Sequence, residues 1–271
     1  MIREALAASA DALRAAGVED PRLDAEVLLA EATDWDRARL AAEPEAEIPP
    51  AAARRFGEMV RRRLRREPVA YIVGRRGFRH IELGVDPRVL IPRPETELLV
   101  ELALELAPRR VLDVGTGSGA IALAVADELP GCEVVATDTS APALEVARVN
   151  AERLGLAERV ELVEGTLPRG AGEFDLVLAN LPYLAESDWG GLQPEVTEWE
   201  PREALLAGVD GLDAIRAAIG GFGQANAPVV GLEVGVGQAG AVGELLRQAG
   251  FASIETRLDL AGIERVVMGG P

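Results

Sequence analysis

Four consecutive residues, Asn180-Leu181-Pro182-Tyr183, carry groups suited to holding a planar nitrogen. The Asn180 side-chain oxygen and the Leu181 backbone carbonyl can accept hydrogen bonds from the two hydrogens of an NH2 group. Such acceptors orient the nitrogen and stabilise the positive charge that forms on it during alkylation. Pro182 fixes the local backbone, and Tyr183 can stack on a flat substrate group. The segment indicates alkylation of an amide or amine nitrogen. The alternative is an Asx-type turn followed by a core tyrosine.

A glycine-rich loop, Gly115-Thr116-Gly117-Ser118-Gly119, indicates a nucleoside cofactor. It lies between a predicted strand, Arg110 to Val114, and a predicted helix that begins at Ala120. Glycines let the chain turn sharply at the end of a strand and let a ligand touch the backbone. Asp138 ends the next predicted strand, where a carboxylate can bind a ribose hydroxyl or cap the following helix. This loop also fits the dinucleotide pattern, so by itself it does not distinguish S-adenosylmethionine from NAD.

Asp113 favours S-adenosylmethionine as the cofactor. It precedes the first glycine of the loop by two positions. Methyltransferases of this fold carry an acidic residue there, which supports the loop or the methionine amino group, whereas NAD enzymes usually do not. The alternative for Asp113 is a cap on the following helix or loop.

Composition excludes several kinds of site. The 271 residues contain one cysteine, Cys132, and one histidine, His80, so we expect no disulfide, no Cys/His metal site and no Ser-His-Asp triad. No apolar run approaches the roughly 18 residues that cross a membrane, and the first residues are typical of an amphipathic helix and not of a signal peptide. These features predict a cytoplasmic protein that is not bound to a membrane.

Charge is distributed unevenly. The net charge is -17, which would repel a nucleic-acid backbone. Residues 51–80 nevertheless contain ten arginines and only two acidic residues, Glu58 and Glu67. This Arg-rich window is either a solvated surface or a docking surface for an acidic partner.

The pattern of apolar residues predicts three regions. Residues 2 to 66 show helical spacing, interrupted at Asp20-Pro21 and Pro49-Pro50, and residues 78 to 91 resemble a β-hairpin with turn signals at Gly84 and Asp86-Pro87. We therefore predict an N-terminal helical domain (1–75), a hairpin linker (76–92) and an α/β domain (93–271). The α/β domain should be a seven-stranded, doubly wound, Rossmann-like sheet whose last two strands form an antiparallel edge. Its predicted strands are 110–114, 133–137, 160–163, 174–179, 228–234, 254–258 and 265–268.

At this point the chain resembles a known family, the HemK-type protein-(glutamine-N5) methyltransferases, which modify the Gly-Gly-Gln glutamine of peptide-chain release factors. The resemblance covers nearly the whole chain, and its most specific segment is Ile91 to Glu97. DNA adenine methyltransferases share the Asn-Pro-Pro-Tyr theme but lack that segment. The other shared segments are Glu67 to Gly74, Val89-Leu90, the glycine loop, Asn180 to Tyr183, Glu200-Pro201, Ala204-Leu205, Asp210-Gly211-Leu212 and Glu233-Val234-Gly235.

The resemblance implies roles for individual residues. Gly115 to Gly119 and Asp138 would bind S-adenosylmethionine, with Arg93 and Glu95 shaping its pocket. Asn180 would contact both cofactor and substrate, and Asn180 to Tyr183 would hold the glutamine. An N-terminal cap and a surface ion pair are the alternatives for Arg93 and Glu95.

The chain departs from the family pattern at two places. The family motif is Asn-Pro-Pro-Tyr, and here Leu181 replaces its first proline. Since the acceptor at that position is a backbone carbonyl, we expect activity to be retained. The family has an Asp followed by an aromatic residue after the third strand, where this chain has Thr166-Leu167, so Leu167 would take the position beside the adenine.

Three rival functions remain open from the sequence. They are an NAD-dependent oxidoreductase, a DNA or RNA adenine methyltransferase acting on a flipped base, and a binding module that has lost turnover. The resemblance favours an enzyme whose partners are release factors, with no direct contact to nucleic acid. We expect it to be a monomer.

Overall fold

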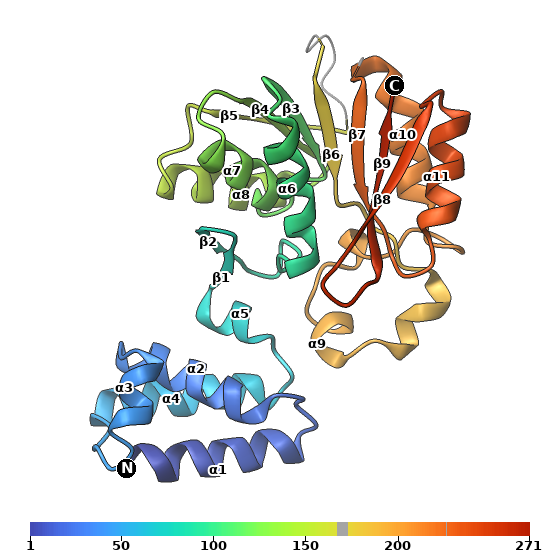
Figure 1. Cartoon of the computed structure of the whole chain (residues 1–271). Coiled ribbons are helices and arrows are strands. Elements are labelled where there is room, and N and C mark those ends of the chain that lie inside the picture. The colour runs from blue at the N-terminus through green and yellow to red at the C-terminus, as the bar shows by residue number, and fades with distance from the viewer. Residues whose placement is uncertain (167–172, 226) are drawn as a thin grey trace. The chain divides into compact units, whose positions relative to one another are not determined.

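The computed structural model describes residues 1–166, 173–225 and 227–271. These residues form two compact units (Figure 1). The first contains Met1–Arg75 together with Gln193–Trp199, and the second contains Arg76–Leu192 and Glu200–Pro271. Among the described residues, no helix is both long and apolar enough to cross a membrane.

The first unit is helical, as the spacing of its apolar residues predicts. Proline begins three of its helices, where a missing N–H is tolerated and the fixed φ suits the first turn. Leu6, Leu13, Leu28, Leu29 and Phe56 belong to its buried core. Its helices are α1 (Ile2–Ala15), α2 (Pro21–Thr33), α3 (Arg37–Ala42), α4 (Pro50–Arg63), α5 (Val69–Val73) and α9 (Pro194–Thr197).

Buried ion pairs hold α9 in this unit although it lies far along the chain. Glu195 accepts from Arg63 Nη1 at 2.7 Å and binds both nitrogens of the Arg66 fork. Arg63 itself is buried and also bonds Asp24 Oδ2 at 2.7 Å. Nothing in the local pattern of residues 193–199 predicts this return, because it depends on pairs separated by 129 positions.

A two-stranded sheet, β1 (Arg75–Phe78) and β2 (Ile81–Gly84), forms the expected hairpin. Its turn is Arg79-His80, earlier than the glycine and proline signals indicate. Arg79 has a φ of 52°, which is unusual for a residue other than glycine. Contacts far along the chain hold it there: its N–H donates to Glu97 Oε1 at 3.0 Å, and its guanidinium binds Glu128 at 2.7 and 2.8 Å.

The second unit contains a seven-stranded sheet in the order β5-β4-β3-β6-β7-β9-β8. The five strands from β5 to β7 are parallel, and β9 is antiparallel to both of its neighbours. This confirms the predicted doubly wound sheet with an antiparallel edge. The strands are β3 (Arg110–Val114), β4 (Glu133–Asp138), β5 (Val160–Glu164), β6 (Leu176–Ala179), β7 (Val229–Glu233), β8 (Ser253–Leu258) and β9 (Glu264–Gly270).

Helices cover both faces of this sheet (Figure 1). Alternate residues of each strand enter different cores: Val111 packs in the cluster that includes α6 and α7, and Leu112 in the cluster that includes α10 and α11. The helices are α6 (Glu97–Leu106), α7 (Ala120–Glu128), α8 (Ala141–Arg153), α10 (Asp213–Ala225) and α11 (Ala239–Gln248), with short 3-10 turns η1 (Pro94–Thr96), η2 (Glu186–Gly191) and η3 (Arg202–Ala204).

The strand order places a crevice at one point of the sheet edge. After β3 the chain continues to β4 on one side and later returns to β6 on the other. In open parallel sheets, ligands bind outside the carboxyl ends of the strands at this reversal. The glycine loop follows β3 and the Asn180 segment follows β6, so both lie at this point.

Candidate active site

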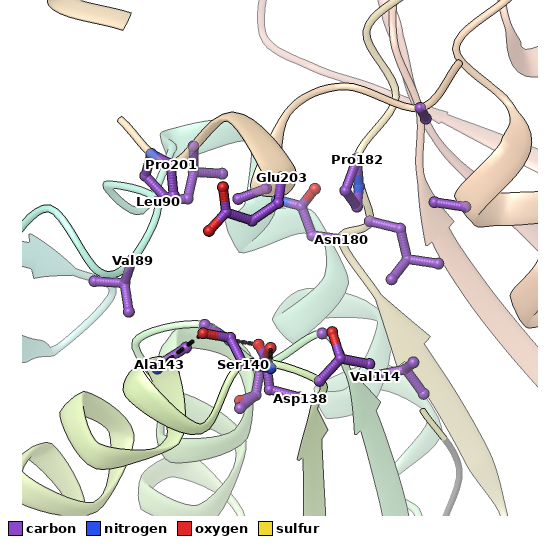
Figure 2. A pocket seen from close by; sticks show the side chains of 18 of the residues that line it. Val89, Leu90, Val114, Asp138, Ser140, Ala143, Asn180, Pro182, Pro201 and Glu203 are labelled. Atoms are coloured by element: carbon purple, nitrogen blue, oxygen red, sulfur yellow. Dashed lines mark hydrogen bonds between the residues drawn. The ribbon is translucent and has the colours of Figure 1, made fainter. Parts of the chain in front are cut away.

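A cavity of about 500 Å³ lies at the carboxyl ends of the parallel strands in the second unit. Asn180, Pro182 and Glu203 are on one side of it, and Val114, Asp138 and Ser140 are on the opposite side (Figure 2). Its volume is within the usual range for small-molecule sites. Other segments that line it are 88–90, 92–93, 115–118, 165–166, 206–208 and the first turns of α10.

The glycine loop and the Asn180 segment lie in contact. Gly115, Gly117 and Gly119 have positive φ angles of 77°, 57° and 85°, a region that suits glycine. A Cβ atom on Gly115 would lie 3.0 Å from Leu181 Cδ2. Position 115 therefore favours glycine for its backbone angle, a side chain there would have to displace the tip of Leu181, and the two predicted motifs face each other.

Gly119 has a packing role. It does not line the cavity, and a Cβ there would lie 2.8 Å from Leu123 Cδ1. It also precedes α7 as its N-cap residue. Gly115, Thr116, Gly117 and Ser118 line the cavity, so four of the five loop residues are placed to touch a ligand.

Asp113 supports the glycine loop from its buried side. It is fully buried and accepts hydrogen bonds from Thr116 Oγ1 at 2.6 Å and Ala122 N at 3.2 Å. Burial raises its pKa to about 7. Asp113 does not line the cavity, so of the roles considered from the sequence its contacts match support of the loop and the following helix.

Asp138 lines the cavity and joins two elements. Its Oδ2 accepts from Gly117 N at 2.9 Å, and its Oδ1 accepts from Ser140 N at 2.8 Å. The N-cap of α8 is Ser140 and not Asp138. A carboxylate can accept more than two hydrogen bonds, so Asp138 retains capacity for a ribose hydroxyl.

Asn180 is held by a neighbour that the sequence did not single out. Its Nδ2 donates to Thr96 Oγ1 at 2.9 Å. Asn180, Leu181 and Pro182 line the cavity, but Tyr183 does not. Tyr183 instead packs in the core beside β7, and its hydroxyl donates to Glu233 Oε1 at 3.4 Å. Burial raises the pKa of Tyr183, so its hydroxyl stays protonated.

Glu200 anchors the Ile91–Glu97 segment. This buried carboxylate binds Arg93 Nη2 and accepts from Ile91 N at 3.2 Å. Arg93 lines the cavity as expected, whereas Glu95 does not. Leu167, predicted to lie beside the adenine, is outside the described residues.

The charges that line the cavity suit a cationic ligand. Arg88 is paired with Asp86, and Arg93 is paired with Glu200. Asp138 and Glu203 also line it, and among the described residues neither is in an ion pair. No group of histidine, cysteine and acidic side chains in the described part of the chain could hold a metal ion. Electrostatics therefore favours a ligand carrying positive charge.

Together the fold and the site define a class of enzyme. A glycine-rich loop faces an Asn-x-Pro-Tyr segment at the reversal point of a Rossmann-like sheet, which is the arrangement expected of a nitrogen methyltransferase. Comparison with known proteins supports this class. The PrmC N-terminal domain matches residues 4–74, and the methyltransferase small domain matches residues 94–191.

Curated relatives narrow the class to a family. The release factor glutamine methyltransferase of Moorella thermoacetica is 44% identical over 97% of this chain and 96% of its own length. That of Geobacter sulfurreducens is 43% identical over 93% and 90%. The chain belongs to the release factor glutamine methyltransferase family. It is a methyltransferase, and the oxidoreductase alternative is wrong.

A solved structure gives independent support for the fold. The N-terminal domain of human METTL16 in complex with SAH aligns with a TM-score of 0.50, at 17% identity, over 69% of this chain and 75% of that one. At this identity the likeness concerns the fold alone.

Proposed function

We propose that this chain methylates the side-chain N5 of the glutamine in the Gly-Gly-Gln motif of peptide chain release factors, with S-adenosylmethionine as methyl donor. The observation that carries the proposal is the contact between the glycine loop and the Asn180 segment. It brings a nucleoside site next to two acceptors for an NH2 group. Membership of the release factor glutamine methyltransferase family supports the choice of substrate.

The residues fit the proposed cofactor. Positive-φ glycines at 115 and 117 allow close approach to the backbone, and Asp138 provides a carboxylate for the ribose. The unpaired carboxylates around the cavity suit the positive charges of the sulfonium and amino groups. When bound, S-adenosylmethionine would supply an electrophilic methyl group to the substrate nitrogen, with S-adenosylhomocysteine as the leaving group and one proton lost from the nitrogen.

The chain itself contributes orientation and electrostatic stabilisation. The Asn180 Oδ1 and the Leu181 carbonyl accept from the glutamine NH2 group and hold its nitrogen for in-line attack. As the nitrogen becomes positive these acceptors bind it more strongly, which lowers the barrier. Since Tyr183 bonds Glu233 and does not line the cavity, its proposed part is to shape the segment from its buried end, and stacking on the substrate would require it to turn.

The proposed partner is the release factor protein. We propose that the chain acts as a monomer in the cytoplasm, with no direct nucleic-acid contact. Its net charge of -17 favours a protein substrate over a nucleic acid.

Peptide mass spectrometry tests the proposal. The enzyme and labelled S-adenosylmethionine are incubated in three separate reactions. One contains a full-length release factor, one contains a variant factor whose Gly-Gly-Gln glutamine is changed to alanine, and one contains a mixture of RNA and DNA. We expect label on that glutamine only. Label on nucleic acid, or equal label on the variant factor, would overturn the proposal.

A further inference from the structure

A buried carboxyl group lies behind the Asn180 segment. Glu233 ends β7 and is 2% exposed. Its Oε1 accepts from the Tyr183 hydroxyl at 3.4 Å, while within the described residues its Oε2 has no hydrogen-bond partner. Burying a carboxyl group with an unsatisfied oxygen costs free energy, so Glu233 is a candidate for a functional role.

Thr96 lies between Glu233 and Asn180. It is 3% exposed, and its Oγ1 accepts from Asn180 Nδ2 at 2.9 Å. A hydroxyl that accepts one hydrogen bond still has a proton to donate. Glu233 lies close enough for the Thr96 hydroxyl to lower its pKa, against the larger effect of burial, and its Oε2, which has no other partner among the described residues, is the acceptor available to that proton.

The arrangement of Asn180, Thr96 and Glu233 determines which way the Asn180 amide points. The amide can present either its oxygen or its NH2 group to the cavity. If the Thr96 proton points to a carboxylate, the Thr96 oxygen can only accept, so the NH2 group of Asn180 must face Thr96. The Asn180 oxygen is then left for the substrate. If the acceptor behind Thr96 is lost, Thr96 can donate to Asn180 and the amide can turn.

We propose that Glu233 and Thr96 are positioning residues that keep the acceptor oxygen of Asn180 directed at the substrate nitrogen. The inference rests on the proposed methylation of a glutamine amide. Glu233 also accepts from the Tyr183 hydroxyl, so it is linked directly to the last residue of the Asn180 segment and, in this proposal, to the first residue through Thr96. Neither Glu233 nor Tyr183 lines the cavity, and both act through Asn180 and the local backbone.

A pH dependence follows from the same geometry. Only the ionised Glu233 is an obligate acceptor, and burial raises its pKa to about 7. The charge of Glu95 raises this pKa further, while Arg265 on β9, Thr96 and Tyr183 lower it. Lowering the pH through about 7 therefore protonates Glu233, and kcat should fall on the acid side.

Three variants test the assignment: Thr96→Val, which keeps the shape but removes the hydroxyl, Thr96→Ser, which keeps the hydroxyl, and Glu233→Gln. We expect kcat on a release factor to fall about 10- to 100-fold for Thr96→Val and Glu233→Gln, the range typical when a group that orients a ligating side chain is removed. Thr96→Ser should stay within about threefold of the parent. The acid limb of kcat should disappear in Glu233→Gln.

Cofactor binding separates positioning from general damage. Calorimetric affinity for S-adenosylhomocysteine should change less than about twofold in all three variants, because the glycine loop and Asp138 are untouched and both substitutions of Thr96, which lines the cavity, introduce no larger side chain. Thr33→Val is a matched control: Thr33 is partly buried in the first unit and its hydroxyl donates to Leu29 O at 2.8 Å. It should leave kcat unchanged.

The outcomes are distinct. Parent kcat in Thr96→Val, or a loss of cofactor affinity parallel to the loss of kcat, would overturn the inference. Absence of any methyl transfer by the parent chain would instead refute the proposed function. If Glu233→Gln fails to fold, Thr96→Val and Thr96→Ser still decide the matter.

Discussion

Leu181 contributes two separable groups to the site. Its side chain packs on Gly115, and its backbone carbonyl is the proposed acceptor for the substrate NH2 group. Among the described residues, the Leu181 N–H has no hydrogen-bond partner. A residue without an N–H could therefore stand there.

Leu181→Pro tests which group matters. Because proline keeps the carbonyl, we expect kcat/KM on a release factor to stay within about fivefold, or about 1 kcal/mol. Asn180→Ala, assayed in parallel, should lose at least about 100-fold, since it removes an acceptor for the developing charge. Equal losses in the two variants would show that the leucine side chain is needed.

Individual site residues were predictable only where their position next to a predicted strand identifies them. The glycine loop, Asp138 and Asn180 follow strands and could be found from the sequence. Thr96 and Glu200 could not be assigned roles, because their partners lie 84 to 109 positions away. For Tyr183 the residue type suggested substrate contact, and nothing in the sequence indicated that its hydroxyl bonds a buried carboxyl group.

At the scale of elements, the segment after η3 supports the Asn180 segment. Leu184 N donates to Leu205 O, and Ala207 N donates to Leu184 O, both at 2.9 Å. Gly211 follows with a φ of 73°, and a Cβ there would lie 2.3 Å from Tyr183 O. Any side chain at position 211 would push the backbone at this position away from the backbone at Tyr183.

Gly211→Ala should therefore lower both stability and activity. We expect the free energy of unfolding to fall by about 1 to 3 kcal/mol, because an alanine would be strained at this φ and its Cβ would clash with the Tyr183 carbonyl. Gly220→Ala is the control: Gly220 is in α10 and nothing lies within 4 Å of its Cβ position. That change should be neutral or slightly stabilising in urea unfolding. A stable, fully active Gly211→Ala enzyme would refute this role for the segment.

The elements themselves were largely predictable because buried parallel strands are short apolar runs between helices. The predicted bounds of β3 agree with the structure, and those of β7 differ by one residue at each end. The hairpin turn at Arg79 and the return of residues 193–199 were not predictable. Both are stabilised by arginine-carboxylate pairs between distant positions, which leave no periodic pattern.

For the whole molecule, two buried acids set the dependence of stability on pH. Burial raises the pKa of Asp113 and of Glu233 to about 7, far above the ordinary range of carboxyl groups. Between about pH 5 and 7 the folded chain thus binds more protons than the unfolded chain, so stability falls as the pH rises. Carboxylates with lowered pKa, such as Glu128 beside Arg79, lose their stabilisation only at lower pH.

We expect the free energy of unfolding to fall by on the order of 1 to 2 kcal/mol per pH unit across this window and to level off above it. Asp113→Asn, which cannot ionise, should remove part of that slope. Urea unfolding at four pH values between 5 and 8 measures it. An unchanged slope in the variant would mean that Asp113 is ionised throughout.

The Arg-rich window is mostly occupied by structural ion pairs. Arg62 binds Glu67 and the carbonyls of Tyr71 and Ile72, and Arg63 is buried. Arg54, Arg61 and Arg65 are exposed, and within the described residues their side chains are in no ion pair. We propose these three as a docking surface for an acidic part of the release factor. Arg62 is unsuitable for testing it, because a change there would disturb the fold.

Reversal of all three charges (Arg54→Glu, Arg61→Glu, Arg65→Glu) should lower kcat/KM for the full-length factor by roughly tenfold or more at low salt, mainly through slower association. A short Gly-Gly-Gln peptide should be methylated at the parent rate because it lacks the acidic part of the factor that this surface would bind. Reversal of Arg14, Arg148 and Arg247 gives the same change in net charge at exposed positions paired only with near neighbours on their own helices. If that control slows the full-length factor equally, total charge and not this surface governs the encounter. If the peptide slows as much as the protein, the arginines affect catalysis and not docking.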